Sequence, residues 1–503
     1  MSNTDGYESP RDGAAEGRRL GGALKWAFAM KWGQQITGSA VRLVLMALLD
    51  VEAFGLVGMA WLYIMFVEMF LDQGFTAALI QRRDLHQRHL ESVFWVVLVF
   101  SLALTGLSVA VSGWWAEMNG EPDLAPVIRA MSIVIPIQGL TTVQVAIFQR
   151  SMDFRSLAIR NFAAVLMSAI VGISLALAGF GVWALVFQQV TNSVVALVLL
   201  WTLSTWRPRL RFSISATWEL LGFSTGNFVA KLGVFIGNRS DELLIGLFFG
   251  AFAVGIYRSA MGLVSMLVDL GTRAIGQVSF PQFSRSQDDF AALRRDLMFF
   301  VWLSGILMAP ALSVLAGTSD SLMAILGDRW RDAADVLQIL CLVGLAQSLT
   351  NFIAPVLQGL GRTRALVVVV WCTAMISNVT FVIVGLMARG EPQPLQPLWM
   401  ATARALLFIG LYLPISLLLL RSVCGFTLGA FFTATRSSVL AGAVAYGLVR
   451  GLGASGLLAT WPDWSALIAK GALGIAVAFA ILGLSDREFQ RRAFALLRQR
   501  GVA

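Results

Sequence analysis

Long apolar stretches separated by short polar ones run along the chain. The first two, residues 23–49 and 53–80, are joined by a short acidic turn that contains Asp50 and Glu52. About 20 apolar residues in a helix cross the roughly 30 Å hydrocarbon core of a bilayer. Fourteen stretches reach that length, so we predict an all-α integral membrane protein with about 14 transmembrane helices. The stretches cover 23–49, 53–80, 91–115, 124–148, 155–178, 181–205, 217–249, 250–282, 290–317, 333–360, 364–388, 395–420, 427–450 and 463–484.

The composition narrows the class of protein further. Hydrophobic residues make up 57% and charged residues 13% of the 503 residues, and the mean hydropathy is +0.75. An ordinary soluble domain has about 25% charged residues. The sequence also shows no Gly-rich phosphate-binding loop, no nucleophile elbow and no cluster of metal ligands. We therefore expect a membrane transporter, not an enzyme, without a cofactor or a metal.

The cysteines and histidines suggest no separate chemistry. Cys341, Cys372 and Cys424 lie in or beside apolar stretches without paired spacing, so they are expected to be buried thiols. His86 and His89 fall in one short basic segment, which is expected to be a solvated loop and not a metal pair.

The net charge of +9 is distributed in a way that predicts orientation. Even-numbered loops are rich in arginine, whereas odd-numbered loops mix few arginines with acids such as Glu117 and Asp123. Because basic loops stay in the cytoplasm, we predict that both termini are cytoplasmic and that nucleic acid is not a partner. The basic residues of the even loops and the C-terminal tail include Arg82, Arg83, Arg88, Arg150, Arg155, Arg207, Arg209, Arg211, Arg285, Arg294, Arg295, Arg362, Arg364, Arg421, Arg487, Arg491, Arg492, Arg498 and Arg500.

The design of the first two spans recurs about 200 residues later, at 217–249 and 250–282. A weaker similarity relates 126–140 to 335–349 at an offset of 209. Repeated helix pairs that carry charges are typical of transporters built from two related halves, so we predict two six-helix bundles around a central cavity. The predicted division is a disordered cytoplasmic tail (1–21), an N-terminal bundle (22–205), a basic cytoplasmic linker (206–216), a C-terminal bundle (217–421), an additional helix pair (422–485) and a basic cytoplasmic tail (486–503).

Ionisable residues inside the predicted spans are the candidate functional residues. An unpaired charge at bilayer depth costs several kcal/mol, so such residues face a cavity or a partner. Either they line a cavity, where arginines bind phosphate oxygens and acids take up a proton or Na⁺, or they form internal salt bridges. The candidates are the cations Lys31, Arg42, Lys231, Arg258 and Arg273, the acids Glu68, Asp72, Glu242 and Asp269, and the polar residues Gln35, Asn227 and Asn238. Arg160, Arg404, Arg436 and Lys470 lie outside the repeated pairs and receive no role.

Several segments resemble the polysaccharide-transporter branch of the multidrug/oligosaccharidyl-lipid/polysaccharide exporter superfamily. They are most similar to flippases of the exopolysaccharide, colanic-acid and teichuronic-acid type, over roughly residues 20–420. The segments that carry the resemblance are AFGLVGMAWLYIMFVEMFLDQGFTAALIQRRDL (53–85), AIFQRSMDFRSLA (146–158), GFGVWALVFQQV (179–190), WRPRLRFS (206–213) and NRSDELLIGLFFGAFAVGIY (238–257).

The resemblance implies a function, a location and partners. Members of the family move polyprenyl-diphosphate-linked oligosaccharide across the bacterial inner membrane by alternating access, in lipid and beside polysaccharide polymerase or export machinery. Asp241 falls where the family often has an acid, which adds it to the candidates for ion coupling. Glu242 stands where an amide is common.

Three other functions are open to the same sequence. A cation-coupled multidrug exporter would favour a more acidic cavity than the candidate residues provide. A peptidoglycan-precursor flippase would share the same architecture and the same kind of headgroup. A membrane polymerase or ligase is disfavoured because the longest odd loop, near 318–332, is too short for a catalytic domain.

Overall fold

The computed structural model describes residues 32–71, 75–82, 85–214, 224–287, 289–458, 460–486 and 489–491, and some side chains within these ranges lie outside the description. Every regular element among the described residues is a helix. The chain forms two compact units. The first comprises the described residues of Met1–Leu48, Tyr63–Ala116 and Pro122–Leu232, and the second those of Leu49–Leu62, Glu117–Glu121 and Gly233–Ala503.

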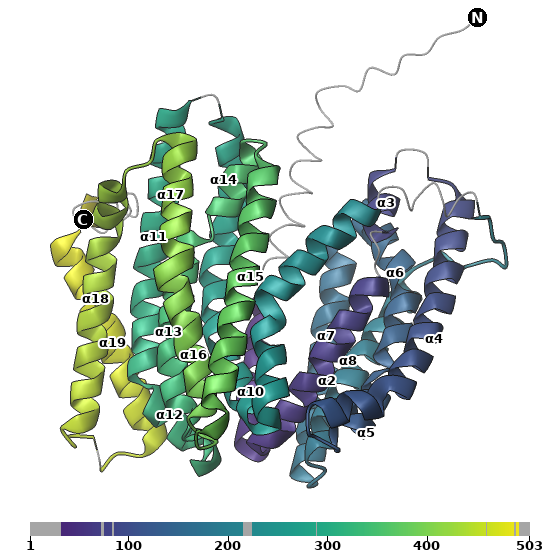
Figure 1. Cartoon of the computed structure of the whole chain (residues 1–503), viewed down its shortest axis with the longest axis horizontal. Coiled ribbons are helices and arrows are strands. Elements are labelled where there is room, and N and C mark those ends of the chain that lie inside the picture. The colour runs from purple at the N-terminus through teal and green to yellow at the C-terminus, as the bar shows by residue number, and fades with distance from the viewer. Residues whose placement is uncertain are drawn as a thin grey trace, which may run out of the picture. The chain divides into compact units, whose positions relative to one another are not determined.

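The first unit contains the second half of α2 (Val51–Leu71), a helical segment over residues 32–48, and six further helices. These are α3 (Phe75–Gln81), α4 (Gln87–Met118), α5 (Leu124–Met131), α6 (Val134–Arg150), α7 (Phe154–Leu177) and α8 (Val182–Leu203). Within it, α7 packs against α8 and α8 packs against α6, as Figure 1 shows. Small buried residues on α7, such as Ala164 and Gly172, allow this close packing of apolar helices.

Two sequence segments that carry the family resemblance meet at the end of α3. Arg150, the last residue of α6, donates hydrogen bonds to the carbonyl oxygens of Leu79, Ile80 and Arg82 at 3.1, 3.2 and 2.6 Å. The last carbonyls of a helix have no partner inside the helix and attract a positive charge. Arg150 therefore stabilises the C-terminal end of α3.

Two motif segments, 146–158 and 179–190, also form a helix start and a turn. Asp153 accepts a hydrogen bond from the backbone N–H of Ser156 at 3.1 Å, and this bond caps the start of α7. Gly179 and Gly181 have φ of 82° and 55° in the turn between α7 and α8. Only glycine adopts such angles without strain, which explains the two glycines of the GFGVWAL segment.

The second unit contains the first half of α2, most of α10 and the helices that follow α10. Its elements are α10 (Ser224–Arg285, from Gly233), α11 (Phe290–Gly317), α12 (Ser319–Leu326), α13 (Ala333–Thr350), α14 (Ile353–Gly359), α15 (Thr363–Met387), α16 (Gln396–Leu407), a π-helical stretch (Phe408–Tyr412), α17 (Leu413–Cys424), α18 (Leu428–Ala454) and α19 (Asp463–Ser485), with short 3₁₀ turns at Asp328–Trp330 and Ala388–Gly390. An aromatic core includes Phe283, Phe300 and Phe352, with Phe300 5.5 Å from Phe283 and 6.0 Å from Phe352 between ring centroids.

The two C-terminal helices, α18 and α19, pack against α11 within the second unit. Both α18 and α19 contact α11, and they also contact each other (Figure 1). Polar links fasten them to α12: Arg450 forms an ion pair with Asp320, and the Lys470 Nζ donates to the Ser321 hydroxyl at 2.8 Å. Lys470, which had no role in the sequence analysis, thus joins α19 to α12.

α10 consists of two arms that turn back at Gly250. This residue has a non-helical φ of 77° and ψ of −167°. Tyr257 contacts Asp241 and Arg258 contacts Glu242, although each pair is 16 residues apart. In a straight helix 16 residues span about 24 Å, so the contacts require two adjacent arms. The predicted boundary between spans at residues 249 and 250 is therefore confirmed.

Twelve helices among the described residues are long and apolar enough to cross a membrane, which confirms a multi-pass membrane protein. One of these twelve, Arg239–Thr272, contains the turn at Gly250 and so holds parts of two predicted spans. Of the predicted first span, 23–49, residues 32–48 form a helix and residues 23–31 lie outside the described residues. The count of 14 stays a prediction.

The internal repeat has a counterpart in the helix bounds. One apolar span covers Leu124–Arg150 and another covers Ala333–Gly359. Ala333 and Gly359 lie 209 residues after Leu124 and Arg150, which is the offset found in the sequence. Each span is interrupted once, after Met131 and after Thr350, but at this offset Met131 corresponds to Leu340, so the two breaks lie at different places in the repeat.

Two expectations from the sequence are wrong. Cys372 is exposed, whereas Cys341 and Cys424 are buried as expected. His89 is buried in α4, where its Nδ1 accepts the backbone N–H of His86 at 3.0 Å, whereas His86 precedes α4 and is exposed, as expected of a solvated loop.

Arg207 of the predicted linker caps a helix. It donates to the carbonyl oxygens of Trp201 and Ser204 at 2.9 and 2.7 Å, at the end of α8. A guanidinium at this position satisfies carbonyls that have no partner inside the helix. Arg207 therefore stabilises the C-terminal end of α8, and like Arg209 and Arg211 it is exposed.

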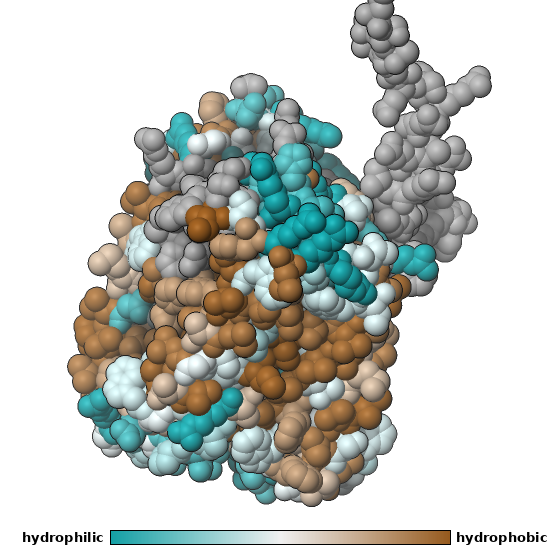
Figure 2. Space-filling view, turned by 90° about the vertical axis from the view of Figure 1, so that its right-hand side faces the viewer, coloured by the Kyte–Doolittle hydropathy of each residue, from teal (hydrophilic) through white to brown (hydrophobic). Residues whose placement is uncertain are grey.

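The surface of the first unit matches a lipid environment. Figure 2 shows a broad band of hydrophobic residues with hydrophilic residues gathered toward its two ends. On α4 and α7, Val99, Leu107 and Ile170 are each more than half exposed. Monomeric soluble proteins rarely expose contiguous apolar patches of this kind, so these helices face hydrocarbon.

Candidate substrate-translocation site

The candidate site begins where the first half of α2 crosses α10 inside the second unit. A Cβ on Gly55 would lie 1.8 Å from the carbonyl oxygen of Ala251, and a Cβ on Gly255 would lie 2.2 Å from that of Val51. The two backbones are therefore in direct contact, which only small residues permit. Glu121 completes the crossing by accepting the N–H of Ala251 at 2.6 Å, at the start of the second arm of α10.

Two arginines hold the carboxylate of Glu242 beside this crossing. Arg239 donates to Oε1 at 2.7 Å, and Arg258 donates to Oε2 at 3.3 Å. The same Arg258 nitrogen also donates to the carbonyl oxygen of Gly58 at 2.9 Å. The Glu242 side chain is 5% exposed. Arg258 therefore connects both arms of α10 to α2.

A second set of polar groups lies one residue away along α10. Asp241 accepts a hydrogen bond from the Tyr257 hydroxyl at 2.6 Å and an ion-paired hydrogen bond from Arg404 of α16. Arg404 also donates to the Tyr257 oxygen at 3.4 Å, and its guanidinium lies 5.6 Å from the Phe408 ring centroid. Asp241 and Tyr257 are buried, and so is Arg404.

We call the six residues that form these two sets the buried charge cluster: Arg239, Asp241, Glu242, Tyr257, Arg258 and Arg404. It holds three arginines and two carboxylates, all inside the second unit. A buried carboxylate that lost its counter-charge would be strongly destabilising. Each buried carboxylate therefore needs an arginine in place, and the cluster carries a small excess of positive charge.

Of the residues predicted from sequence, the structure brings together Arg258, Asp241 and Glu242. Two others, Lys31 and Asp72, lie outside the described residues. The side chains of four more also lie outside the description: Lys231, Arg273, Asn227 and Asn238. For these six the predicted cavity position stays a prediction.

The remaining predicted residues are half-buried and lie in separate places. Gln35 and Arg42 belong to the helical segment 32–48 of the first unit, and Asp269 belongs to the second arm of α10. Glu68 lies on the half of α2 that belongs to the first unit. Its Oε1 is buried and has no hydrogen-bond partner among the residues that the structure describes.

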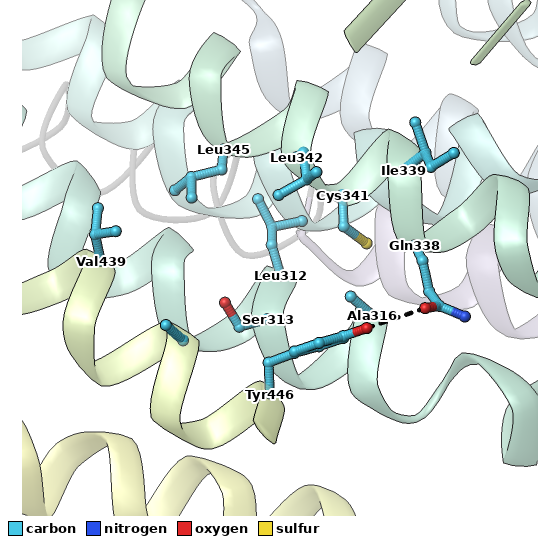
Figure 3. A pocket seen from close by; sticks show the side chains of 11 residues that line it. Leu312, Ser313, Ala316, Gln338, Ile339, Cys341, Leu342, Leu345, Val439 and Tyr446 are labelled. Carbon is cyan, nitrogen blue, oxygen red and sulfur yellow. Dashed lines mark hydrogen bonds between the residues drawn. The ribbon is translucent and has the colours of Figure 1, made fainter. Parts of the chain in front are cut away.

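A cavity of about 400 Å³ lies elsewhere in the second unit, among α11, α13 and α18 (Figure 3). It is lined mainly by apolar side chains such as Leu312, Leu342 and Val439. Its most polar contact is the hydrogen bond from the Tyr446 hydroxyl to Gln338 at 3.2 Å. None of the described residues that line it is charged. The cavity therefore lacks the groups that a diphosphate would need, and it is a separate feature from the buried charge cluster.

The sequence analysis missed Arg404, Tyr257 and Arg239. A lone arginine in the predicted span 395–420 was itself a signal, because ionisable residues within a span mark functional sites. The candidate residues were taken from the repeated spans only, and Arg404 lies outside them. Tyr257 carried no signal, since its partner Asp241 becomes a neighbour only when α10 turns back at Gly250.

The comparison with known families matches residues 44–335 to the model described as "Polysaccharide biosynthesis protein". This match covers more than half of the chain and includes α2 to α12. The chain belongs to this family. The family predicted from the sequence segments is thus confirmed.

Two curated relatives of this family member are polysaccharide proteins by name. The succinoglycan biosynthesis transport protein ExoT of Rhizobium meliloti (strain 1021) is 30% identical over 326 residues, which are 64% of this chain and 66% of ExoT. The teichuronic acid biosynthesis protein TuaB of Bacillus subtilis (strain 168) is 26% identical over 346 residues, 63% of this chain and 71% of TuaB. The alignments thus span about two thirds of the length of these relatives.

A solved structure shares the fold of this protein over nearly its whole length. The lipid II flippase MurJ in an inward closed conformation matches with a TM-score of 0.73 and 15% identity, and the match covers 92% of this chain and 99% of MurJ. At this identity the likeness concerns the fold. The predicted all-α exporter fold is confirmed.

Proposed function

We propose that this chain flips polyprenyl-diphosphate-linked oligosaccharide from the cytoplasmic to the periplasmic leaflet of the bacterial inner membrane. The observation that carries the proposal is the family match over residues 44–335, together with named relatives that act in polysaccharide synthesis and transport. The fold shared with a lipid II flippase supports alternating access as the mechanism. The protein would act as a transporter, with both termini in the cytoplasm.

The charges of the site suit an anionic headgroup. The buried charge cluster holds three arginines against two acids. The cations Lys31, Arg42, Lys231 and Arg273 are proposed to attract the diphosphate, because guanidinium and ammonium groups compensate phosphate charge in a medium of low dielectric constant. Arg258 would join them when its bond to Glu242 opens. A cationic drug would meet net repulsion at the cluster, which disfavours the multidrug alternative.

The lipid tail and the partners follow from the same proposal. The tail would stay in the bilayer while the headgroup crosses, so membrane lipid is a constant partner. The product would pass to a polysaccharide polymerase or export machinery on the periplasmic side. The peptidoglycan-precursor alternative differs in the sugar attached to the same diphosphate, so only the identity of the cargo separates it.

Deletion of the gene in the native host tests the proposal. We expect polyprenyl-diphosphate-linked oligosaccharide to accumulate in the lipid extract while surface polysaccharide disappears, because synthesis continues on the cytoplasmic side without translocation. The measurement is mass spectrometry of the extracted lipid, with a plasmid copy of the gene as the control. An unchanged lipid pool, accompanied by sensitivity to cationic dyes, would favour the drug exporter instead.

A further inference from the structure

Asp241 is a buried carboxylate whose counter-charge belongs to the protein itself. Its side chain is 3% exposed, and Arg404 forms an ion pair with its Oδ2. The Tyr257 hydroxyl donates to the same oxygen at 2.6 Å. A carboxylate at bilayer depth requires a neutralising partner, which in a coupled transporter can be a proton or an exchangeable metal ion. Here the partner is covalently attached to α16.

The type of residue matters for what this partner can do. An arginine stays protonated at any physiological pH, whereas a lysine can lose its proton when buried. The guanidinium also has a second anchor in the face of Phe408, at 5.6 Å. Arg404 therefore offers Asp241 a permanent positive charge at a fixed place.

The neighbouring acid is compensated in the same way. Glu242 is held by Arg239 and Arg258, so both carboxylates of the cluster have arginine partners. An incoming Na⁺ would have to displace a guanidinium and then share the site with it. The repulsion between these two cations at low dielectric constant makes such exchange unfavourable.

We propose that Arg404 is a built-in counter-ion that takes the place of an exchangeable cation at Asp241. In this arrangement Asp241 does not load Na⁺ during the transport cycle, and Arg404 positions it by remaining paired. The sequence analysis had placed Asp241 among the candidates for ion coupling, and the proposal removes it from that role. The inference rests on the proposed function only where it concerns the transport cycle. Na⁺ binding itself can be measured without any transported substrate.

The test is the ion dependence of thermal unfolding, measured on the purified full-length protein in detergent at constant pH and ionic strength. For the wild type we expect the same unfolding temperature in NaCl and in choline chloride. Arg404→Met removes the charge while it keeps an unbranched side chain, and it leaves Asp241 in need of a cation. This variant should be destabilised in choline and gain roughly 5 °C when Na⁺ is in large excess over its dissociation constant.

Two controls separate a counter-ion from an arginine that only fills space. The Asp241→Asn, Arg404→Met double variant has no carboxylate to neutralise, so its unfolding temperature should not respond to Na⁺. Arg404→Lys should also be indifferent to Na⁺, because the adjacent Asp241 carboxylate favours the protonated form of the lysine. An Arg404→Met protein that folds and shows no Na⁺ response would overturn the proposal.

If the Arg404→Met protein does not accumulate in cells, Na⁺ binding to the wild type tests the proposal instead. Binding of radioactive Na⁺ is then compared between the wild type and Asp241→Asn. Equal binding to the two proteins supports the built-in counter-ion. Na⁺ binding that is lost in Asp241→Asn contradicts it. Neither result depends on oligosaccharide transport, so the proposed function stands or falls separately in the deletion experiment.

Discussion

Arg258 shows how one residue can be both a candidate for substrate binding and a structural link. Its guanidinium contacts the carboxylate of Glu242 and the carbonyl oxygen of Gly58, and its side chain is 22% exposed. Arg239 contacts the same carboxylate but is 40% exposed. Water and ions screen the more exposed pair, whereas loss of the more buried partner leaves a desolvated charge behind. The two arginines should therefore differ in their effect on stability.

Replacement of these arginines one at a time measures the difference. We expect Arg258→Gln to reduce the free energy of unfolding by on the order of 3 kcal/mol, because Glu242 and the Gly58 carbonyl both lose a donor. Arg239→Gln, the matched control, should cost about 1 kcal/mol or less. The measurement is the unfolding temperature of each purified variant. An equal loss for both variants would contradict the structural role assigned to Arg258.

At the level of elements, the crossing of α2 and α10 depends on glycine. The second unit also ties this end of α2 to the segment after α12, through an ion pair between Asp50 and Arg329 at 2.8 Å and an edge-on contact between the Phe54 and Trp330 rings at 5.4 Å. The backbone contact at Gly55 and Gly255 leaves no room for a side chain. An added methyl group there must push the helices apart.

Alanine substitutions at two glycines of α10 test this crossing. A Cβ on Gly255 would meet the Val51 carbonyl oxygen at 2.2 Å, whereas a Cβ on Gly276 has no atom within 4 Å. We expect Gly255→Ala to lower the unfolding temperature and to impair export, because overpacking costs about 1–3 kcal/mol. Gly276→Ala should be neutral or stabilising by up to about 1 kcal/mol, since alanine favours a helix. A stabilising Gly255→Ala would show that the crossing is looser than described.

The elements themselves were largely predictable, but their partners were not. The apolar stretches 155–178, 290–317 and 463–484 predicted α7, α11 and α19 to within a residue or so, because helix length and hydrophobicity are local properties. The turn at Gly250 was also found from sequence. The pairing of Asp241 with Arg404 was not, since it joins residues 163 positions apart and follows from how α16 packs.

At the scale of the whole molecule, the residues of α2 are divided between the two compact units. The division falls between Leu62 and Tyr63. Alternating access requires groups of helices that move as bodies, and compact units are the natural candidates for them. The central claim is that such motion carries a lipid-linked oligosaccharide from one leaflet to the other. The cavity that would receive the headgroup rests on Lys31 and Lys231, which are assigned from sequence.

The most direct test of this claim is to measure which leaflet holds the lipid-linked oligosaccharide. Spheroplasts of the native host are treated with a membrane-impermeant glycosidase, and the cleaved fraction of the lipid pool is compared between wild-type cells, cells depleted of the protein, and cells with the Lys31→Glu, Lys231→Glu double variant. We predict that cleavage is high in the wild type and falls about tenfold or more in the other two, with the variant still inserted in the membrane, because reversed charge repels a diphosphate. Wild-type levels of cleavage in the double variant would contradict the cavity assignment, and wild-type levels after depletion would contradict the flippase itself.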